Sequence, residues 1–292
     1  GTPQAPRRAA LTFIFVTVVL DMLALGMVVP VLPHLIEDFL GGDIPRAAQL
    51  VGFFGTVWAV MQFFSMPVMG ALSDRFGRRP VILLSNFGLG LDYVLMALAP
   101  TLSWLFVGRL ISGVTAASIS TSMAYVADVT PPERRAQSFG FVGVAFGLGF
   151  VLGPAIGGLL GSVDPRLPFW AAACASLLNA AYGFFILPES LPRERRRAFE
   201  WRRANPLGSL RFLRAHREVF ALAGAAFLSN LTHAVLPAVV VLYAAYRYSW
   251  DEKAVGLALA AVGISSALVQ GALVGPLVRR FGERRVMIGG LL

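Results

Sequence analysis

The sequence predicts an all-α protein that crosses a lipid bilayer many times, on the basis of composition, long apolar stretches and the placement of arginine. Hydrophobic residues make up 57% of the chain and charged residues 14%, and the mean hydropathy is +0.70, values typical of polytopic membrane proteins. Each complete apolar stretch reaches the roughly 20 residues that a helix needs to span about 30 Å of hydrocarbon. A ninth stretch begins near Val286 and is cut off at Leu292, so we expect about eight and a half transmembrane helices. The complete stretches lie near residues 9–33, 48–72, 80–99, 101–127, 136–161, 167–187, 218–244 and 254–278.

The first stretch carries an acid, Asp21, near its middle. This stretch is too long for a cleaved signal peptide and no small-residue cleavage site follows it, so we expect a permanent helix. Asp92 repeats the situation in the third stretch. A charged carboxylate at bilayer depth costs a few kcal/mol or more. Each acid therefore favours a proton or an internal partner, and both options suit a group that takes up and releases protons.

The net charge of +9 reflects basic residues gathered in alternate loops, and this excludes nucleic acid as a partner. The positive-inside rule makes the loops with most arginines cytoplasmic. The other loops hold four basic residues, and Arg109 lies inside the fourth stretch. A lone cysteine, Cys174, supports neither a disulfide nor a thiolate metal site. The cytoplasmic set has 20 of the 25 basic residues: Arg7, Arg8, Arg75, Arg78, Arg79, Arg134, Arg135, nine arginines between 193 and 217, Arg279, Arg280, Arg284 and Arg285.

One polar, strongly basic segment, residues 189–217, divides the chain. It separates an N-terminal six-helix bundle (1–188) from a partial C-terminal bundle (218–292), and we expect it to be a cytoplasmic linker. Its second half either forms a short helix lying on the anionic inner leaflet or stays disordered.

An internal repeat supports this division. GALSDRFGRR begins at Gly70 and GPLVRRFGER begins at Gly275, and six of ten positions agree. The offset is 275 − 70 = 205 residues and six helices, so the chain is expected to contain a parallel repeat of six-helix halves. Two such halves need roughly 400 residues, so we expect the second half to be incomplete here.

The repeated loop after the second stretch is the most specific local motif. Gly70 is expected to end a helix where another backbone approaches, and Gly77 to permit a tight turn. Asp74 is expected to cap or attract a helix N-terminus. A positive-inside loop alone explains the three arginines but not the acid, the glycines or the repeat. The arginines expected to anchor this loop are Arg75, Arg78 and Arg79.

The third and fourth stretches pair an acid with a base at matching depth. They meet at a turn near Pro100, with Asp92 eight residues before it and Arg109 nine after. At about 1.5 Å per residue both lie roughly 12–14 Å below the turn. Since guanidinium does not deprotonate, Arg109 needs such a partner, either for proton-dependent contact or for a structural salt bridge. Two polar stripes are expected to face a cavity: Ser85, Gly88 and Asp92 on one helix, and Arg109, Ser112, Ala116 and Ser120 on the next.

Together these segments resemble the major facilitator superfamily. The loop at Gly70 resembles its signature between helices two and three, LFVGRLISGVTAA resembles its membrane-embedded arginine motif, and GLGFVLGPAIGG resembles its antiporter motif. LDMLALGMVVPVLP and LDYVLMALAP make the chain most similar to the twelve-helix tetracycline/proton antiporters. Small residues in the antiporter motif also permit close helix packing without any other role. The matching positions there are Gly149, Gly153, Pro154, Gly157 and Gly158.

The resemblance implies roles for particular residues. It places Asp21 and Asp92 in the transport pathway, gives Arg109 a part in proton coupling, and makes Gln62 a pathway glutamine. The resembling pumps carry a histidine in helix eight, where this chain has Ser265, and His233 is a candidate to compensate. The loop residues Gly70 to Arg79 would form a conformational gate. The residues expected to bind substrate are Gln62, Ser85, Asn230, His233 and Gln270, although Asn230 and Gln270 fit helix-packing hydrogen bonds equally well.

The function expected from the sequence is proton-coupled export of a drug through a bacterial inner membrane. The resemblance implies tetracycline as substrate, with Mg²⁺ carried on the drug and no cofactor held by the protein. A multidrug or metabolite exporter and an inactive truncated fragment are the alternatives. An enzyme is not expected because no catalytic constellation is present, and a primary pump is not expected because the chain lacks a GxxxxGK[ST] loop. The oligomeric state is left open.

Overall fold

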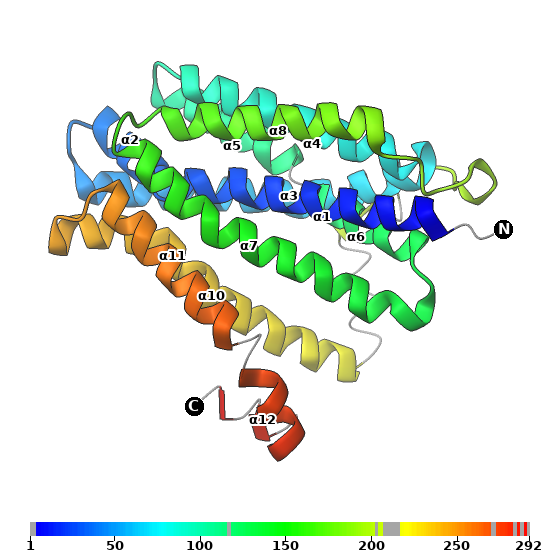
Figure 1. Cartoon of the computed structure of the whole chain (residues 1–292). Helices are drawn as coiled ribbons and strands as arrows, with labels where there is room; N and C mark the ends of the chain where they lie inside the picture. Colours follow the sequence, from blue (N-terminus) through cyan, green and yellow to red (C-terminus); the bar gives the residue numbers. More distant parts are fainter. Residues whose placement is uncertain are drawn as a thin grey trace.

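The computed structural model is helical throughout its regular parts (Figure 1). Two single-turn 3₁₀ segments, Pro132–Arg134 and Arg193–Arg195, join longer helices. The structure describes residues 4–115, 118–201, 204–206, 217–269, 273–282, 285–286 and 289–290. The α-helices are α1 (Gln4–Val28), α2 (Leu32–Phe39), α3 (Ile44–Phe76), α4 (Arg78–Leu98), α5 (Leu102–Thr115), α6 (Ser118–Val129), α7 (Arg135–Gly161), α8 (Leu167–Ile186), α10 (Arg217–Tyr248), α11 (Glu252–Leu268) and α12 (Val274–Phe281).

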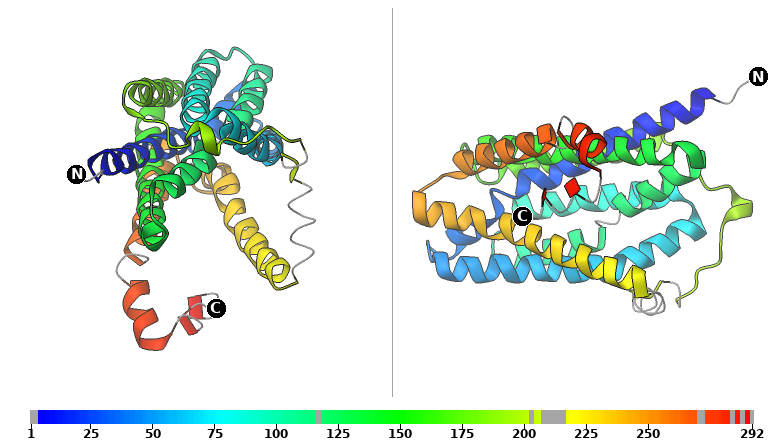
Figure 2. Two further views of the ribbon diagram at one scale, coloured as in Figure 1. Left: turned by 90° about the vertical axis from the view of Figure 1, so that its right-hand side faces the viewer. Right: turned by 90° about the horizontal axis from the view of Figure 1, so that it is seen from below.

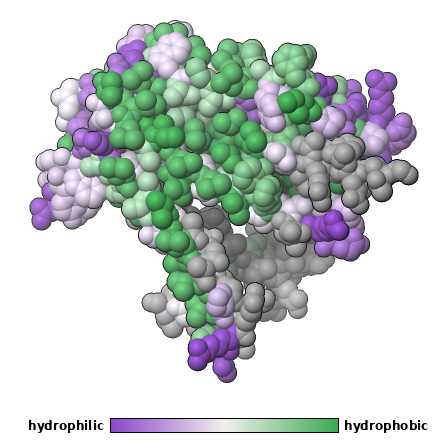
Figure 3. Space-filling model, viewed as in Figure 1, coloured by the Kyte–Doolittle hydropathy of each residue, from purple (hydrophilic) through white to green (hydrophobic). Residues whose placement is uncertain are grey.

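The described residues contain six helical segments long and apolar enough to cross a membrane. They coincide with the first six apolar stretches of the sequence, so the predicted all-α membrane fold is confirmed. The face shown in Figure 3 is mostly apolar across the middle of the bundle, and hydrophilic residues gather toward its ends, as lipid-facing helices require. The segments are Thr12–Phe39, Ile44–Phe76, Arg78–Leu98, Leu102–Val129, Pro132–Gly161 and Leu167–Ile186.

The first apolar stretch is not one continuous helix. It breaks between α1 and α2 around Pro30, because proline lacks an N–H and its ring clashes with the carbonyl four residues earlier. At the break the backbone hydrogen bonds join residues three apart instead of four, from Val29 N to Gly26 O (3.3 Å) and from Val31 N to Val28 O (3.2 Å).

The first half packs as a bundle in which α1 lies against α7 and α8, and α4 lies against α5 and α8. Small residues bring these helices close together. A Cβ placed on Gly90 of α4 would lie 2.6 Å from the Leu177 side chain of α8, and one on Gly183 of α8 would lie 2.7 Å from Leu83 of α4. Close backbone approach at glycine is a usual way for membrane helices to associate.

The second half begins with α10 and α11, and α11 packs along α7 of the first half. The left view of Figure 2, which looks nearly along the helices, shows α10 (yellow) and α12 (red) extending away from the side that α4 and α5 (cyan) occupy. Within the eighth apolar stretch, predicted as one helix over 254–278, α11 covers Glu252–Leu268 and α12 begins at Val274. Residues 270–272 lie outside the described residues, so the single helix stays a prediction.

The two copies of the repeated loop share a local geometry. Gly77 and Gly282 both have positive φ angles, 108° and 81°, in the region that favours glycine. The amide of each donates to the carbonyl four residues earlier, Ser73 for Gly77 (3.1 Å) and Val278 for Gly282 (2.9 Å). In each copy an arginine also lies over the ring of the next phenylalanine: Arg75 over Phe76 at 5.1 Å and Arg280 over Phe281 at 5.5 Å. The two repeated loops therefore share a backbone conformation as well as a sequence pattern.

Gly70 does not have the place expected for it. The helix α3 continues to Phe76, so Gly70 lies inside the helix and not at its end. A Cβ added at Gly70 would meet nothing within 4 Å in the described structure. The prediction that Gly70 ends a helix is therefore wrong, and the close approach of another backbone to it stays a prediction.

Candidate functional site

The acid and the base predicted to pair, Asp92 of α4 and Arg109 of α5, are both buried, with 1% and 8% of their surface exposed. Glycine allows the two helices to come this close. A Cβ on Gly108 would lie 2.6 Å from Met96 Cγ and 3.0 Å from Asp92 Oδ1, and one on Gly88 would lie 2.6 Å from Thr115 Cγ2. The helical rise therefore brings Asp92 beside the Gly108–Arg109 peptide, as the depth calculation predicted.

No ion pair of 4.0 Å or less joins Asp92 to Arg109. Among the described residues neither carboxylate oxygen of Asp92 accepts a hydrogen bond, and the Arg109 Nε donates none. The Arg109 Nη2 faces Met96 Sδ at 3.8 Å, and a thioether is a weak acceptor. A buried carboxylate and a buried guanidinium thus lie near each other without a direct contact.

In the polar stripes on α4 and α5, Ser85 is fully buried and Ser112 is 2% exposed, whereas Gly88 and Ser120 are partly exposed. That these stripes face a cavity stays a prediction. The Ser112 hydroxyl donates to the Arg109 carbonyl at 3.4 Å. Ala116 lies outside the described residues.

Asp21 of α1 is buried against α8, with 5% of its surface exposed. Asn179 Nδ2 donates to Asp21 Oδ1 at 3.1 Å. Tyr93, the residue after Asp92, is 2% exposed and belongs to the same buried apolar cluster as Ala24 of α1, three residues after Asp21. The two acids therefore belong to one buried region inside the first half.

Sequence reasoning missed Asn179 and its second partner, Thr17. Both side chains are fully buried, and they link α8 to α1 across 162 residues of sequence. The available signal was an amide in the middle of an apolar stretch, which in lipid is expected to find a polar partner on another helix.

The remaining residues predicted to bind substrate are only partly described. Gln62 of α3 is half-buried, and its backbone nitrogen lies 3.5 Å from a Cβ placed on Gly113 of α5. The structure describes the backbone but not the side chains of Asn230 and His233, and Gln270 lies outside the described residues.

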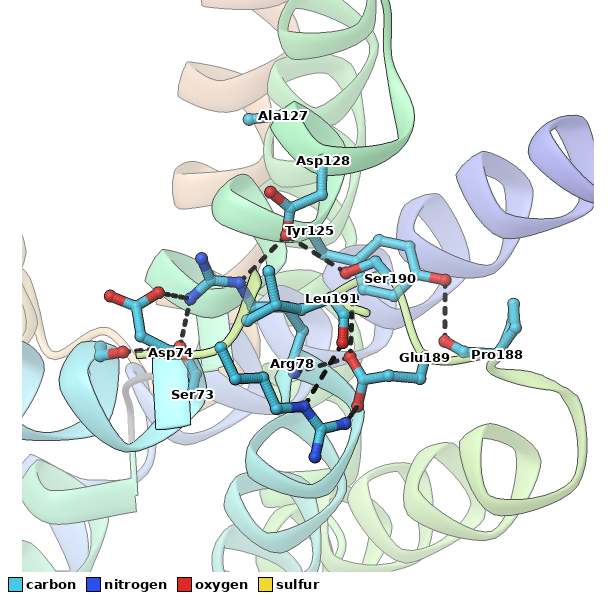
Figure 4. A network of polar contacts seen from close by, with 12 residues as sticks. Ser73, Asp74, Arg78, Tyr125, Ala127, Asp128, Pro188, Glu189, Ser190 and Leu191 are labelled. Atoms are coloured by element: carbon cyan, nitrogen blue, oxygen red, sulfur yellow. Dashed lines mark hydrogen bonds and ion pairs between the residues drawn. The ribbon is translucent and has the colours of Figure 1, made fainter. Parts of the chain in front are cut away.

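A polar network joins three parts of the chain at the end of the bundle where α3 ends and α4 begins (Figure 4). Its centre is Arg78, whose guanidinium contacts Asp74 Oδ1 through Nη1 at 2.6 Å and Asp128 Oδ2 through Nε at 3.1 Å. The Ser190 hydroxyl also donates to Asp128 Oδ2, at 3.3 Å. We call Asp74, Arg78, Asp128, Glu189 and Ser190 the linker-end network.

Glu189, immediately before the linker, holds the start of α4. Its Oε1 accepts from the amides of Arg78 (2.9 Å) and Leu191 (3.0 Å), and its Oε2 lies 3.7 Å from Arg196 Nη2. A carboxylate at a helix N-terminus satisfies a free N–H and complements the helix dipole. The cap expected from Asp74 is thus supplied by Glu189, while Asp74 pairs with Arg78 one turn later.

The other loop arginines hold the same end of the bundle. Arg79 Nη2 donates to the Phe184 carbonyl of α8 at 2.6 Å, and its guanidinium lies 5.8 Å from the Phe184 ring. Arg75 is exposed and lies over Phe76.

The glycines of α7 serve two interfaces. Gly149, Gly153 and Gly157 face α1, where a Cβ at Gly149 would lie 2.6 Å from Met22 Cβ and one at Gly153 would lie 2.7 Å from Gly26 Cα. Gly158 faces α11, where a Cβ would meet the Glu252 carbonyl and the Gly256 Cα. Pro154 contributes to both contacts: its Cδ lies 2.9 Å from a Cβ on Gly26, and its carbonyl oxygen lies against Gly256.

Among the described residues no group of three or more His, Cys, Asp or Glu side chains could hold a metal ion.

Comparison with known proteins gives concordant results. A family model described as Major Facilitator Superfamily matches residues 14–292. The class C tetracycline resistance protein of Escherichia coli is 42% identical over 282 residues, which cover 97% of this chain and 70% of that protein. The class B protein of Escherichia coli is 32% identical over 277 residues, covering 95% and 68%. The crystal structure of the human organic anion transporter MFSD10 (TETRAN) superposes with a TM-score of 0.74 at 29% identity, covering 92% of this chain and 72% of that one.

Proposed function

Because this chain belongs to the Major Facilitator Superfamily and is a membrane transporter, we propose that it exports tetracycline in exchange for protons. Similarity to the tetracycline resistance proteins of classes C, G and D, among others, supports the substrate. Tetracycline would travel as a chelate with a divalent cation such as Mg²⁺, so that the metal is part of the cargo. The arginine distribution supports a bacterial inner membrane with the N-terminus and residues 189–217 on the cytoplasmic side.

The observation that carries the proton coupling is the buried pair of Asp92 and Arg109. The guanidinium stays protonated, so an ionised Asp92 balances its charge. A proton on Asp92 leaves Arg109 as an unbalanced buried cation, which is costly. Protonation therefore favours any conformation in which Arg109 gains another partner or water, and it biases the two halves toward one orientation.

The proton-motive force can supply enough free energy for this exchange. Moving one charge through 100 mV yields about 2.3 kcal/mol, which corresponds to roughly a 50-fold concentration ratio. Asp21 is the second proton-coupling acid in this proposal. Gln62 and Ser85, with Asn230, His233 and Gln270 of the second half, are the proposed substrate contacts, and the loop residues Gly70 to Arg79 are the proposed gate.

Uptake of labelled tetracycline into everted membrane vesicles tests the proposal. Wild-type protein expressed from its complete gene should accumulate the drug when a proton gradient is imposed, and an uncoupler should abolish the accumulation. Asp92→Asn should reduce gradient-driven uptake at least tenfold with normal membrane insertion. Asp38→Asn, the same change at an exposed acid of α2, is the matched control and should behave as wild type. Uptake that does not respond to the uncoupler would reject proton coupling.

A second candidate substrate class is organic anions, favoured by the 29% identity and TM-score of 0.74 to the human organic anion transporter. The same uptake assay, with a fluorescent organic anion in place of tetracycline, separates the two substrate classes. Gradient-dependent movement of the anion without movement of tetracycline would favour this second function.

A further inference from the structure

The amide of Asn179 ties Asp21 to a second residue of α1. Asn179 Nδ2 donates to Asp21 Oδ1 at 3.1 Å and to the Thr17 carbonyl at 3.3 Å. The Thr17 hydroxyl donates in turn to Asn179 Oδ1 at 3.1 Å. All three side chains are buried, at 0% exposed for Thr17 and Asn179 and 5% for Asp21.

Thr17 determines which way the amide points. Its carbonyl oxygen can only accept a hydrogen bond, so the amide atom facing it must be the NH₂ group. Its hydroxyl then meets the amide oxygen and donates to it. The same NH₂ group has two hydrogens, and the second faces Asp21 Oδ1. The flip of the amide is therefore fixed by chemistry, and Asp21 always meets a donor.

We propose that Asn179, oriented by Thr17, is the positioning residue of Asp21 and holds one oxygen of its carboxyl group throughout the transport cycle. This inference rests on the proposed role of Asp21 in proton exchange. An oxygen that accepts an N–H can do so as a carboxylate or as the carbonyl oxygen of a neutral acid. The Asn179 bond to Oδ1 therefore survives protonation, and the proton is bound and released at Oδ2.

A neutral amide can hold Asp21 without adding a charge to a buried region that already contains Asp21, Asp92 and Arg109. On α4 the titratable Tyr93 follows Asp92 and packs in the same buried cluster as Ala24 of α1. From α7, Gly149 and Gly153 approach this part of α1. On α8, the titratable Tyr182 stacks on Phe13 at 5.1 Å, about two turns before Asp21. Asn179 thus fixes the direction of the carboxyl without changing the net charge of the region.

The first test needs no assumption about substrate. Purified protein is treated with a carbodiimide, and labelling of Asp21 is followed by mass spectrometry. Asn179→Leu has nearly the same shape but no donor, so Oδ1 is released and labelling should become at least threefold faster. Thr17→Val should change the rate in the same direction, while Thr17→Ser keeps the hydroxyl and should match wild type. Ser176→Ala, a buried hydroxyl one turn earlier on α8, is the matched control and should leave the rate unchanged.

The second test separates positioning from a merely structural role. In everted vesicles, drug/drug exchange needs the conformational change but no net proton movement, whereas uphill uptake needs both. Asn179→Leu and Thr17→Val should lower gradient-driven uptake at least fivefold and change drug/drug exchange less than twofold. Thr17→Ser and Ser176→Ala should leave both rates as in wild type.

The outcomes are distinct. Unchanged Asp21 labelling in a folded Asn179→Leu or Thr17→Val protein overturns the proposal, as does an equal loss of exchange and uphill uptake. A Ser176→Ala protein that behaves like Asn179→Leu overturns it too, because the effect would then follow from any lost buried polar group. If wild-type protein shows no gradient-driven tetracycline uptake, the proposed function fails, and the labelling rates still decide whether Asn179 holds Asp21.

Discussion

Replacing Gly77 by alanine should destabilise the first half strongly, because the residue is constrained in two ways. Its φ of 108° lies where a non-glycine residue costs about 1–3 kcal/mol. The new Cβ would also lie 2.7 Å from Glu189 Cδ and 2.9 Å from Arg196 Nη2, so the Glu189 carboxylate must move away. That movement breaks at least one charge-assisted hydrogen bond to the start of α4, worth about 1.5–3 kcal/mol.

The two contributions add to roughly 2.5–6 kcal/mol. At about 2 °C per kcal/mol for a chain of this size, the melting temperature in detergent should fall by roughly 5–12 °C. Thermal unfolding followed by intrinsic tryptophan fluorescence measures this shift. Gly70→Ala is the matched control from the same loop, because a Cβ there meets nothing within 4 Å and alanine favours the helix by about 0.5–1 kcal/mol. Equal melting temperatures for Gly77→Ala and wild type would refute the reasoning.

Two further substitutions test contacts at other places. Arg166→Ala removes two hydrogen bonds of 3.0 Å, from Nη1 to the Ala97 carbonyl and from Nη2 to the Ala99 carbonyl. It should lower the stability by about 1–3 kcal/mol. Its melting temperature should be lower than that of the control Arg166→Lys, which can replace one of the bonds. Gly256→Ala places a Cβ against the Pro154 carbonyl and 2.9 Å from Gly158 Cα, and overpacking of the α7–α11 interface should cost about 1–3 kcal/mol. Vesicle uptake normalised to inserted protein should fall. An unchanged uptake rate would show that α11 can shift at no cost.

The sequence predicted those features that follow from chain geometry alone. Six membrane-crossing segments follow from the length of apolar stretches, since a helix rises about 1.5 Å per residue through about 30 Å of hydrocarbon. The same fixed rise predicted that Asp92 and Arg109 lie at one depth. Gly77 was predicted to form a turn because only glycine adopts its backbone conformation easily.

Other features depend on which side chains meet across the fold, and the sequence could not supply them. Asn179 meets Asp21 across 158 residues, and Glu189 meets the amide of Arg78 across 111. Spacing along one helix assigned Ser85 and Ser112 to polar faces but could not say that packing buries both hydroxyl groups. Asp74 was expected to cap α4, yet Glu189 reaches the free amide and Asp74 pairs with Arg78. Local sequence does not determine which of two acids accepts the hydrogen bond from the free amide at a helix end.

The repeat provides an internal comparison that separates the two causes of the Gly77 effect. Gly282 has the same kind of backbone conformation, with φ of 81° and the same hydrogen bond to the carbonyl four residues earlier. In the described structure, however, a Cβ at Gly282 would meet nothing within 4 Å. Gly282→Ala should therefore cost only the backbone strain, about 1–3 kcal/mol.

The difference between the two substitutions then measures the contact with Glu189 and its partner Arg196. Glu189→Gln supplies the check, because the amide can still accept from the Arg78 N–H but no longer carries the charge that complements the start of α4. In the Glu189→Gln background, Gly77→Ala should cost less than in wild type and approach the cost of Gly282→Ala. Thermal unfolding of the single and double variants gives all of these values. If Gly77→Ala and Gly282→Ala cost the same in the wild-type background, the backbone conformation explains both and Glu189 contributes nothing to the requirement for glycine.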